Sequence, residues 1–298
     1  MRDIIIVGAG IAGQVLCREL ALSGIPSVLI DNRSFPREKV CGGVLQWDSW
    51  QYLDSLFSLP KPQVLSHIGH YWGRKFLSRH SLKHPMVTMP RIALDSFLNG
   101  TNHAKNQKIS EKALVIRADG AEKKKGDWIG FQAEVPGTDA PELQMFYGKG
   151  IYLGSVPLND GKRHAAFVMK KNLFSGILSL KEKIKEEFGM EVSEIKGSSV
   201  IDYRHVSQDL AVGDAKMPTH PFLGFGMKHA ILSARLMASH IRSGTLERYA
   251  SDHVKLFWRS RIANQLSGAL FDSPFRALLK PALSSRPLFN RFYFWLHS

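Results

Sequence analysis

The stretch that begins the chain, residues 4–31, reads IIIVGAGIAGQVLCRELALSGIPSVLID. Its apolar run at 4–7 is typical of a strand buried on both faces, and residues 14–22 predict a helix. Residues 28–30 predict a second strand, which ends at Asp31. A strand, a glycine turn, a helix and a second strand in this order predict a βαβ unit that opens an α/β domain.

Three glycines in the turn have the spacing G-x-G-x-x-G, and each has a physical role. Gly8 permits the tight turn, Gly10 allows the backbone to approach a pyrophosphate, and Gly13 allows the helix to pack closely on the strand. The free N–H groups at the helix N-terminus favour the same phosphates. Asp31 is placed to accept a hydrogen bond from a ribose hydroxyl. The segment predicts a dinucleotide site, with a turn that serves packing alone as the alternative.

Further segments carry related signals. Residues 32–45, NRSFPREKVCGGVL, form a basic loop that ends in Cys-Gly-Gly. Residues 90–98, PRIALDSFL, predict the start of a helix. Residues 210–215, LAVGDA, predict a short strand followed by Gly-Asp-Ala. Residues 221–227, PFLGFGM, then open a long helix.

Together these segments resemble the motifs of the flavoprotein family that contains the geranylgeranyl reductases and the p-hydroxybenzoate-hydroxylase-like oxidoreductases. The resemblance implies FAD as the cofactor and FAD-dependent oxidoreduction as the activity. The positions that match the family's cofactor motifs are Gly8, Gly10, Ala12, Gly13, Asp31, Asn32, Arg33, Lys39, Cys41, Gly42, Gly43, Arg91, Gly213, Asp214, Pro221, Gly224, Gly226 and Met227.

The resemblance also implies roles for some of these residues. Arg33 and Lys39 would neutralise FAD phosphates, residues 41–43 would lie near the isoalloxazine, and Arg91 would lie over the FAD. Asp214 would bind ribityl or ribose hydroxyls. The helix after the second motif would point its positive end at the ring edge that becomes negative on reduction. Solvated surface charge is the alternative for the basic residues.

The catalytic side chains are less clear from the sequence. Cys41 and His220 are the candidates, with a small buried thiol and an exposed loop imidazole as the alternatives. Lys216 stands where ring-hydroxylating relatives usually have His, which favours reduction over hydroxylation. The halogenases' Trp-x-Trp-x-Ile-Pro signature is missing, and so is the prenyl reductases' Pro-x-x-Tyr-x-Trp-x-Phe-Pro pattern. No second G-x-G-x-x-G is present, so NAD(P)H is expected to bind transiently, or another electron donor would serve.

One departure from the family concerns the chain between the Arg91 helix and residues 118–120. The family carries several more strands there, which help to grip the adenine end of FAD, whereas this chain has only residues 99–112. The departure motivates an alternative function, in which a shortened and catalytically inactive relative acts as a basic lipid- or protein-binding module.

The middle of the chain predicts an antiparallel sheet that covers the flavin. Its strand-like segments are 128–131, 143–147, 150–154 and 164–168, and the Asn-Asp-Gly at 159–161 predicts a hairpin. The candidates for the substrate pocket are Phe146, Tyr147, Tyr152 and Leu153, with an ordinary core position as the alternative for each. Residues 180–188 predict an amphipathic covering helix.

The C-terminal region mixes basic with large apolar residues. Residues 249–265 predict a helix, and 275–296 combine Arg and Lys with Phe, Tyr and Trp. We expect the first half to dock on the substrate domain, whereas the last part suits either docking or an anionic membrane interface. The net charge of +14 and the pI near 9.8 fit an anionic partner. Nucleic acid is not expected, because no motif accompanies the charge.

Composition narrows the class of protein. The chain has 298 residues, of which 44% are hydrophobic and 22% charged, and this excludes a disordered or fibrous protein. Its two cysteines cannot form a disulfide framework, which favours a reducing, cytoplasmic compartment. Neither a signal peptide nor a transmembrane run is expected. No cluster of His, Cys and carboxylates has metal-site spacing.

The expected fold is α/β, with a discontinuous Rossmann-like FAD-binding domain, an inserted antiparallel β-sheet substrate domain and a helical C-terminal extension. We assign residues 1–60, 86–126 and 198–245 to the FAD-binding domain, 61–85 and 127–197 to the substrate domain, and 246–298 to the extension. The expected function is FAD-dependent oxidoreduction of an apolar lipid, prenyl or polyketide-like substrate, by reductase or monooxygenase chemistry.

Overall fold

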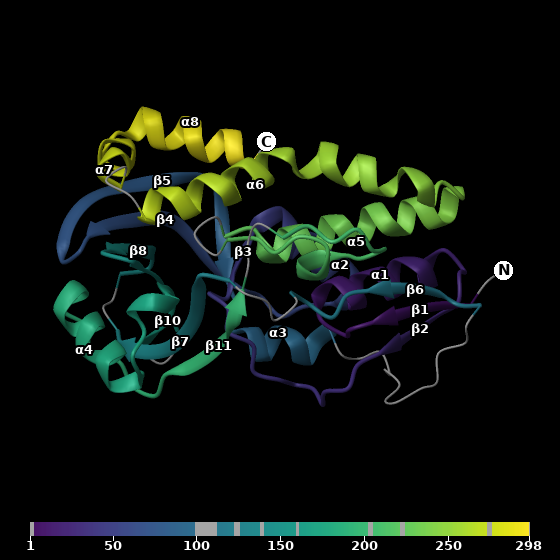
Figure 1. The fold of residues 1–298 in the computed structure, drawn as a ribbon, viewed down its shortest axis with the longest axis horizontal. Coiled ribbons are helices and arrows are strands. Elements are labelled where there is room, and N and C mark those ends of the chain that lie inside the picture. The colour runs from purple at the N-terminus through teal and green to yellow at the C-terminus, as the bar shows by residue number, and fades with distance from the viewer. Residues whose placement is uncertain are drawn as a thin grey trace.

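Two β-sheets and a set of C-terminal helices make up the fold (Figure 1). The computed structural model describes residues 3–98, 112–121, 126–137, 140–158, 161–201, 205–220, 224–272 and 276–297. The smaller sheet lies at one end of the molecule and the larger at the other, and α6–α8 follow one edge of the view. The expected α/β fold is confirmed.

The smaller sheet is parallel and contains the predicted βαβ unit. Its strand order is β2-β1-β6, with β1 at Ile4–Val7, β2 at Ser27–Ile30 and β6 at Leu114–Arg117. Helix α1 (Ile11–Leu22) connects β1 to β2 and packs beside α5 (Gly226–Ser243). Ala211, from the predicted short strand, forms a parallel bridge to Arg117 and so extends this sheet.

The larger sheet has the order β11-β7-β10-β9-β8-β4-β5-β3. Its strands are β3 (Val44–Gln46), β4 (Gln63–Trp72), β5 (Lys75–Thr88), β7 (Trp128–Pro136), β8 (Leu143–Gly148), β9 (Ile151–Pro157), β10 (Lys162–Lys170) and β11 (Lys196–Ile201). All neighbouring pairs are antiparallel except β4 and β8, which are parallel. The expected antiparallel sheet is therefore mixed, because the chain leaves it after β5, passes through α3 (Arg91–Leu98) and β6, and returns at β7.

Strand alternation gives this sheet two different buried faces. On one face, Phe146 and Leu153 pack with Leu180 and Ile184 of helix α4 (Ile177–Phe188). On the other face, alternate residues of the same strands pack towards the C-terminal helices; they include Met145, Tyr147, Tyr152, Val156 and Val168. The second face is the one that bears on function.

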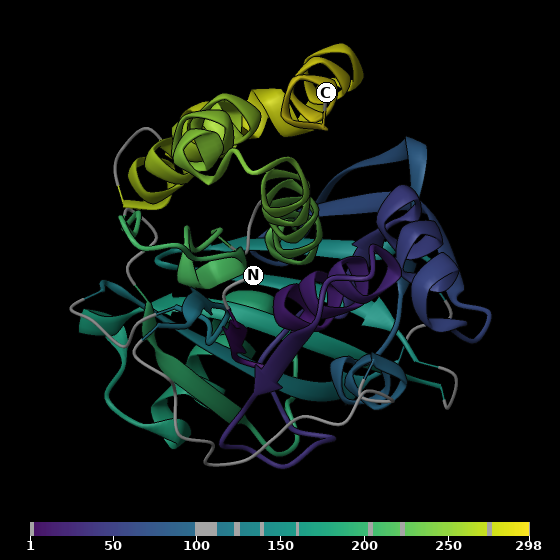
Figure 2. The same cartoon turned by 90° about the vertical axis from the view of Figure 1, so that its right-hand side faces the viewer.

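The C-terminal helices dock on the larger sheet. They are α6 (Tyr249–Asp272), α7 (Arg276–Ser284) and α8 (Arg286–His297), and the turned view of Figure 2 shows them gathered at one side of the molecule. Leu283 and Phe289 are buried in one cluster with Leu65 and Ile68 of β4. The Ser78 hydroxyl donates a hydrogen bond of 2.7 Å to the carbonyl of Leu283. Both α7 and α8 thus contribute residues that pack against the larger sheet.

The remaining elements are short. Helix α2 spans Trp47–Phe57, and 3₁₀ turns lie at Lys171–Leu173, Gly213–Ala215 and Leu246–Arg248. Asn159 and Asp160 of the predicted hairpin, and residues 99–111, lie outside the described residues.

Gly13 is a position where added bulk disturbs the fold. A Cβ there would lie 1.9 Å from the carbonyl oxygen of Gly8, whereas a Cβ at Gly10 would meet only side-chain atoms, Nη2 of Arg37 at 3.4 Å and Nη2 of Arg91 at 3.9 Å. We expect Gly13→Ala to destabilise the protein by about 1–3 kcal/mol, because backbone must move, and Gly10→Ala to leave the unfolding midpoint nearly unchanged. Thermal unfolding followed by circular dichroism checks the pair, and equal midpoints would contradict this packing.

Candidate functional site

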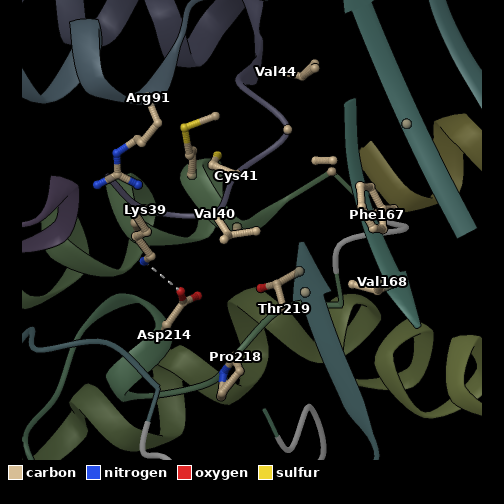
Figure 3. Close-up of a pocket in the computed structure, with 18 of the residues that line it drawn as sticks. Lys39, Val40, Cys41, Val44, Arg91, Phe167, Val168, Asp214, Pro218 and Thr219 are labelled. Atoms are coloured by element: carbon tan, nitrogen blue, oxygen red, sulfur yellow. Dashed lines mark hydrogen bonds and ion pairs between the residues drawn. The ribbon is translucent and has the colours of Figure 1, made fainter. Parts of the chain in front are cut away.

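A single long cavity of about 530 Å³ connects the glycine turn to the face of the larger sheet. Its outer end is lined by the β1–α1 turn, the basic loop and the segment that begins at Asp214. Its inner end lies between the larger sheet and α7–α8. Figure 3 shows residues that line the cavity, among them Lys39, Cys41, Asp214, Thr219 and Phe167.

The Asp31 carboxylate ties the glycine turn to the basic loop. The backbone N–H of Ala9 donates to Oδ2 at 2.8 Å, and the N–H of Arg33 donates to Oδ1 at 2.9 Å. The guanidinium of Arg37 adds an ion pair to Oδ2 at 3.3 Å. The carboxylate, which is almost fully buried, therefore positions the loop over the turn.

Two guanidinium groups lie beside Gly10, at the N-terminus of α1. A Cβ at Gly10 would lie 3.4 Å from Nη2 of Arg37 and 3.9 Å from Nη2 of Arg91. Arg91 is held by Asp95, with Nε 2.7 Å from Oδ1 and both side chains buried. Burial lowers the pKa of Arg37, and the neighbouring Asp31 partly opposes this. Two guanidiniums and a helix N-terminus around one glycine form a donor set suited to a pyrophosphate.

Arg37 is absent from the set of cofactor residues that the motifs indicate, since the sequence alone leaves it as one basic residue of a loop. The signal that could have identified it is the Phe-Pro-Arg at 35–37, directly after Asp31. Its guanidinium lies 4.5 Å above the Phe35 ring, which helps to fix its direction.

The basic loop also contacts the later Gly-Asp segment. Lys39 forms an ion pair with Asp214 at 3.3 Å, drawn in Figure 3. Gly213 has a positive φ of 61°, and a Cβ there would lie 2.9 Å from the Cβ of Ala12. The small residues allow the segment to lie directly against the start of α1, so the two distant motifs meet as the sequence predicts.

The Cys-Gly-Gly loop is anchored to the larger sheet. The N–H of Cys41 donates to the side-chain oxygen of Gln132 at 3.2 Å. The carbonyl of Cys41 lies 2.7 Å from Nε2 of His164. The thiol itself accepts a 3.4 Å hydrogen bond from the N–H of Gly43. Cys41 and Gly42 line the cavity, and these contacts hold the loop between the two sheets.

His220 does not line the cavity in the described part of the chain. It is 1% exposed, so the expectation of an exposed loop imidazole is wrong. The backbone N–H of His220 donates to Oδ1 of Asn264 at 2.9 Å, and the His220 ring packs edge-on against Trp128. Burial lowers the pKa of His220 to about 3, which keeps the ring neutral. Lys216 is also buried and donates to the carbonyl of Ser207 at 2.7 Å.

The four pocket candidates divide between the two faces of the sheet. Tyr147 and Tyr152 line the inner end of the cavity. Phe146 and Leu153 lie on the opposite face, against α4, and take no part in the lining. The reason is strand alternation, which sends neighbouring residues to opposite faces. His70, which no motif indicates, also lines the inner end.

The residues singled out from the motifs fall into three groups. Those that line the cavity are Gly10, Ala12, Arg33, Lys39, Cys41, Gly42, Arg91, Asp214, Gly224, Gly226 and Met227. Those that do not line the cavity are Gly8, Gly13, Asp31, Asn32, Gly43 and Gly213. Pro221 lies outside the described residues.

In the described ranges, no helix has the length and apolar character needed to cross a membrane.

Comparisons with known proteins test the fold. No family model and no curated protein matches the chain. Among solved structures, FqzB matches with a TM-score of 0.73 at 16% identity, covering 95% of this chain and 88% of that one. A geranylgeranyl bacteriochlorophyll reductase-like protein from Thermoplasma acidophilum matches with a TM-score of 0.71 at 16% identity, covering 95% and 91%. PqsL from Pseudomonas aeruginosa, a probable FAD-dependent monooxygenase, matches with a TM-score of 0.66 at 16% identity, covering 98% and 99%.

The likeness extends over most of each chain, so it concerns the whole architecture and not the glycine turn alone. At this level of identity it is a likeness of fold. The chain has the same fold as these solved structures, which include a probable FAD-dependent monooxygenase and a geranylgeranyl bacteriochlorophyll reductase-like protein.

Proposed function

We propose that the protein binds FAD along the cavity and acts as an FAD-dependent oxidoreductase on an apolar substrate held at the inner end. The observation that carries this proposal is the polarity of the cavity. Charged side chains, among them Arg37, Arg91 and Asp214, line the outer end, whereas aromatic and aliphatic side chains line the inner end. An elongated cofactor with a charged and a flat apolar half suits such a cavity.

The residues at the outer end fit the pyrophosphate of FAD. Gly10 leaves room for a close approach of the phosphates, and Arg37 and Arg91 supply two guanidinium groups at that point. Lys39 and Asp214, which form an ion pair, would hold the hydroxyl-bearing part of the cofactor. The anchored backbone at Cys41 and Gly42 would place the ring beside the larger sheet. Bound FAD would supply the redox chemistry, and the chain would supply position and exclusion of water.

The type of reaction is proposed on sequence grounds. Lys216, in place of the His of ring-hydroxylating relatives, favours reduction of the substrate over hydroxylation. NAD(P)H is the proposed electron donor, with another donor as the alternative; because no second glycine motif is present, NAD(P)H would bind only transiently. The electron donor can be tested by rapid mixing of the FAD-loaded protein with NADH or NADPH under anaerobic conditions. Reduction of the flavin is followed by the loss of its absorbance. The likeness of the fold to a probable FAD-dependent monooxygenase and to a geranylgeranyl bacteriochlorophyll reductase-like protein, over most of each chain, favours this enzyme over an inactive binding module.

Added bulk at Gly10 should prevent uptake of FAD. In Gly10→Leu the side chain projects between the two guanidiniums, so at least two charge-assisted hydrogen bonds to phosphate are lost, and we expect the Kd for FAD to rise about 100-fold or more. Isothermal titration with FAD measures this. Ala21→Leu adds bulk to the exposed end of the same helix and is the control, with unchanged affinity expected. Equal affinity of Gly10→Leu and the natural protein would place the phosphates elsewhere.

Removal of one cation should weaken FAD without affecting riboflavin. Loss of a hydrogen bond to a charged group costs about 1.5–3 kcal/mol, so Arg37→Gln should raise the Kd for FAD about 10- to 100-fold. Riboflavin lacks phosphates, and its affinity should stay the same. Arg18→Gln, at an exposed position of α1, is the matched control. A parallel loss of riboflavin binding would show that Arg37 acts through the fold.

We further propose that the protein contacts anionic membrane surfaces through α6 and α8. Large apolar side chains are exposed on these helices at Val254, Leu256, Trp258, Ile262, Leu266, Leu288 and Phe292. Lys255 and Arg291 lie exposed among them. Apolar groups interleaved with cations suit an interface of anionic lipids. Phe292 also lines the cavity, so an apolar substrate could pass from this surface into the inner end.

Cosedimentation with vesicles tests this surface. We expect stronger binding to phosphatidylcholine vesicles that contain phosphatidylglycerol than to phosphatidylcholine alone. Leu256→Ser should weaken binding about 10-fold or more, because a buried leucine side chain contributes about 1.5–3 kcal/mol. Leu178→Ser removes a leucine that is even more exposed, from α4 on the far side of the sheet, and should change nothing. Equal effects of the two substitutions would rule out a specific contact by α6.

A further inference from the structure

The inner end of the cavity is an apolar chamber that contains one unusual polar side chain. The chamber is lined by residues of β4, β5 and β8–β10 and of α7 and α8: Ile68, His70, Met86, Leu143, Met145, Tyr147, Tyr152, Val156, Val168, Leu283, Phe289, Phe292 and Tyr293. Within the described residues, the charged side chains that line the cavity all belong to its outer end. His70 is 1% exposed, and the edge of its ring meets Phe289 with centroids 5.1 Å apart.

One nitrogen of His70 has a partner and the other does not. Nδ1 lies 2.8 Å from the hydroxyl of Tyr147. Nε2 is buried and has no hydrogen-bond partner among the described residues. A buried polar atom left without a partner costs about 1–3 kcal/mol, so native proteins retain few of them. His80 does not relieve it: its Nε2 lies against the carbonyl of Leu283 at 2.7 Å, and its Nδ1 also has no hydrogen-bond partner among the described residues.

The charge state of this pair follows from its burial. Burial, with a smaller contribution from His80, lowers the pKa of His70 to about 3, so the ring is neutral at physiological pH. Burial also raises the pKa of the Tyr147 hydroxyl well above its usual value, so the phenol keeps its proton. A phenol is a stronger hydrogen-bond donor than a neutral imidazole N–H, and the bare imidazole nitrogen is the stronger acceptor. Tyr147 therefore donates to Nδ1, and the proton of His70 resides on Nε2.

We propose that His70 determines substrate specificity by donating a hydrogen bond from Nε2 to an uncharged oxygen acceptor on an otherwise apolar substrate. A carbonyl or quinone oxygen on an aromatic or polyisoprenoid framework has this chemistry. A carboxylate is disfavoured, since no cation lines the chamber in the described chain to compensate for its desolvation. The inference deepens the proposed function and rests on it only for the reaction that follows binding.

Two probe molecules that differ only in an oxygen atom replaced by CH₂ test the proposal on the full-length protein. 2-Acetonaphthone carries a ketone oxygen, and 2-isopropenylnaphthalene has the same shape with CH₂ in its place. One hydrogen bond contributes about 0.5–1.5 kcal/mol, so the natural protein should bind the ketone about 3- to 10-fold more tightly, as measured by isothermal titration. Equal affinity for the two probes would overturn the proposal.

Variants assign the preference to His70. His70→Phe keeps a ring in the chamber and should abolish the preference, while its affinity for the hydrocarbon stays within about 2-fold. Tyr147→Phe leaves the imidazole but removes the donor that holds the proton on Nε2, and should reduce the preference even if His70→Phe does not fold. Ile68→Val changes the same chamber wall without a polar group and should keep the full preference. A preference that survives both His70→Phe and Tyr147→Phe would refute the assignment.

The same preparations separate this inference from the proposed function. FAD titration of His70→Phe should give the affinity of the natural protein, because His70 lies at the far end from the two guanidiniums. If the natural protein takes up no FAD but still prefers the ketone, the proposed function fails and the specificity site remains. If FAD binds and the probes do not differ, the specificity site fails alone.

Discussion

The position of the whole outer site depends on the carboxylate of Asp31. It accepts hydrogen bonds from the backbone of the glycine turn and from the backbone of the loop that follows, and it forms an ion pair with Arg37. A buried carboxylate needs such partners, and two of the partners belong to the loop. The contacts that satisfy the carboxylate therefore also fix the position of the loop. The residue that the motif assigns to a ribose hydroxyl is thus first a structural element, which directs Arg37 towards Gly10.

The loop held by Asp31 connects the two halves of the fold. At its far end, Cys41 is bound by Gln132 of β7 and by His164 of β10. One segment is therefore anchored to the glycine turn at its start and to the larger sheet at its end. A cofactor lying along this segment would therefore have a fixed position relative to both sheets.

Local features of the fold could be predicted from the sequence, and so could the meeting of the two glycine-containing motifs, because both resemble motifs of one family. Contacts between distant segments without such motifs could not be predicted. The β1–α1–β2 unit follows from adjacent residues and a fixed glycine spacing. Strand alternation alone places Tyr147 and Tyr152 on the opposite faces of their strands from Phe146 and Leu153. Which of the two faces borders the cavity depends on the helices that cover the sheet, and this could not be predicted from the sequence. His70 was missed for the same reason, because β4 lies beside β8 only in the folded chain.

The parallel pairing of β4 with β8 has a consequence for how the protein reaches its native state. Ile68 of β4 pairs with Leu143 of β8, and the intervening chain contains β5, α3, β6 and β7. Contacts between segments so distant in sequence form late and slow the folding of a domain, since the entropy of closing the loop must be overcome first. On the ribosome, β4 and β5 are synthesised before β8. The edge of β4 that pairs with β8 therefore has no partner strand until β8 has been synthesised. An unpaired strand edge favours aggregation of a nascent chain.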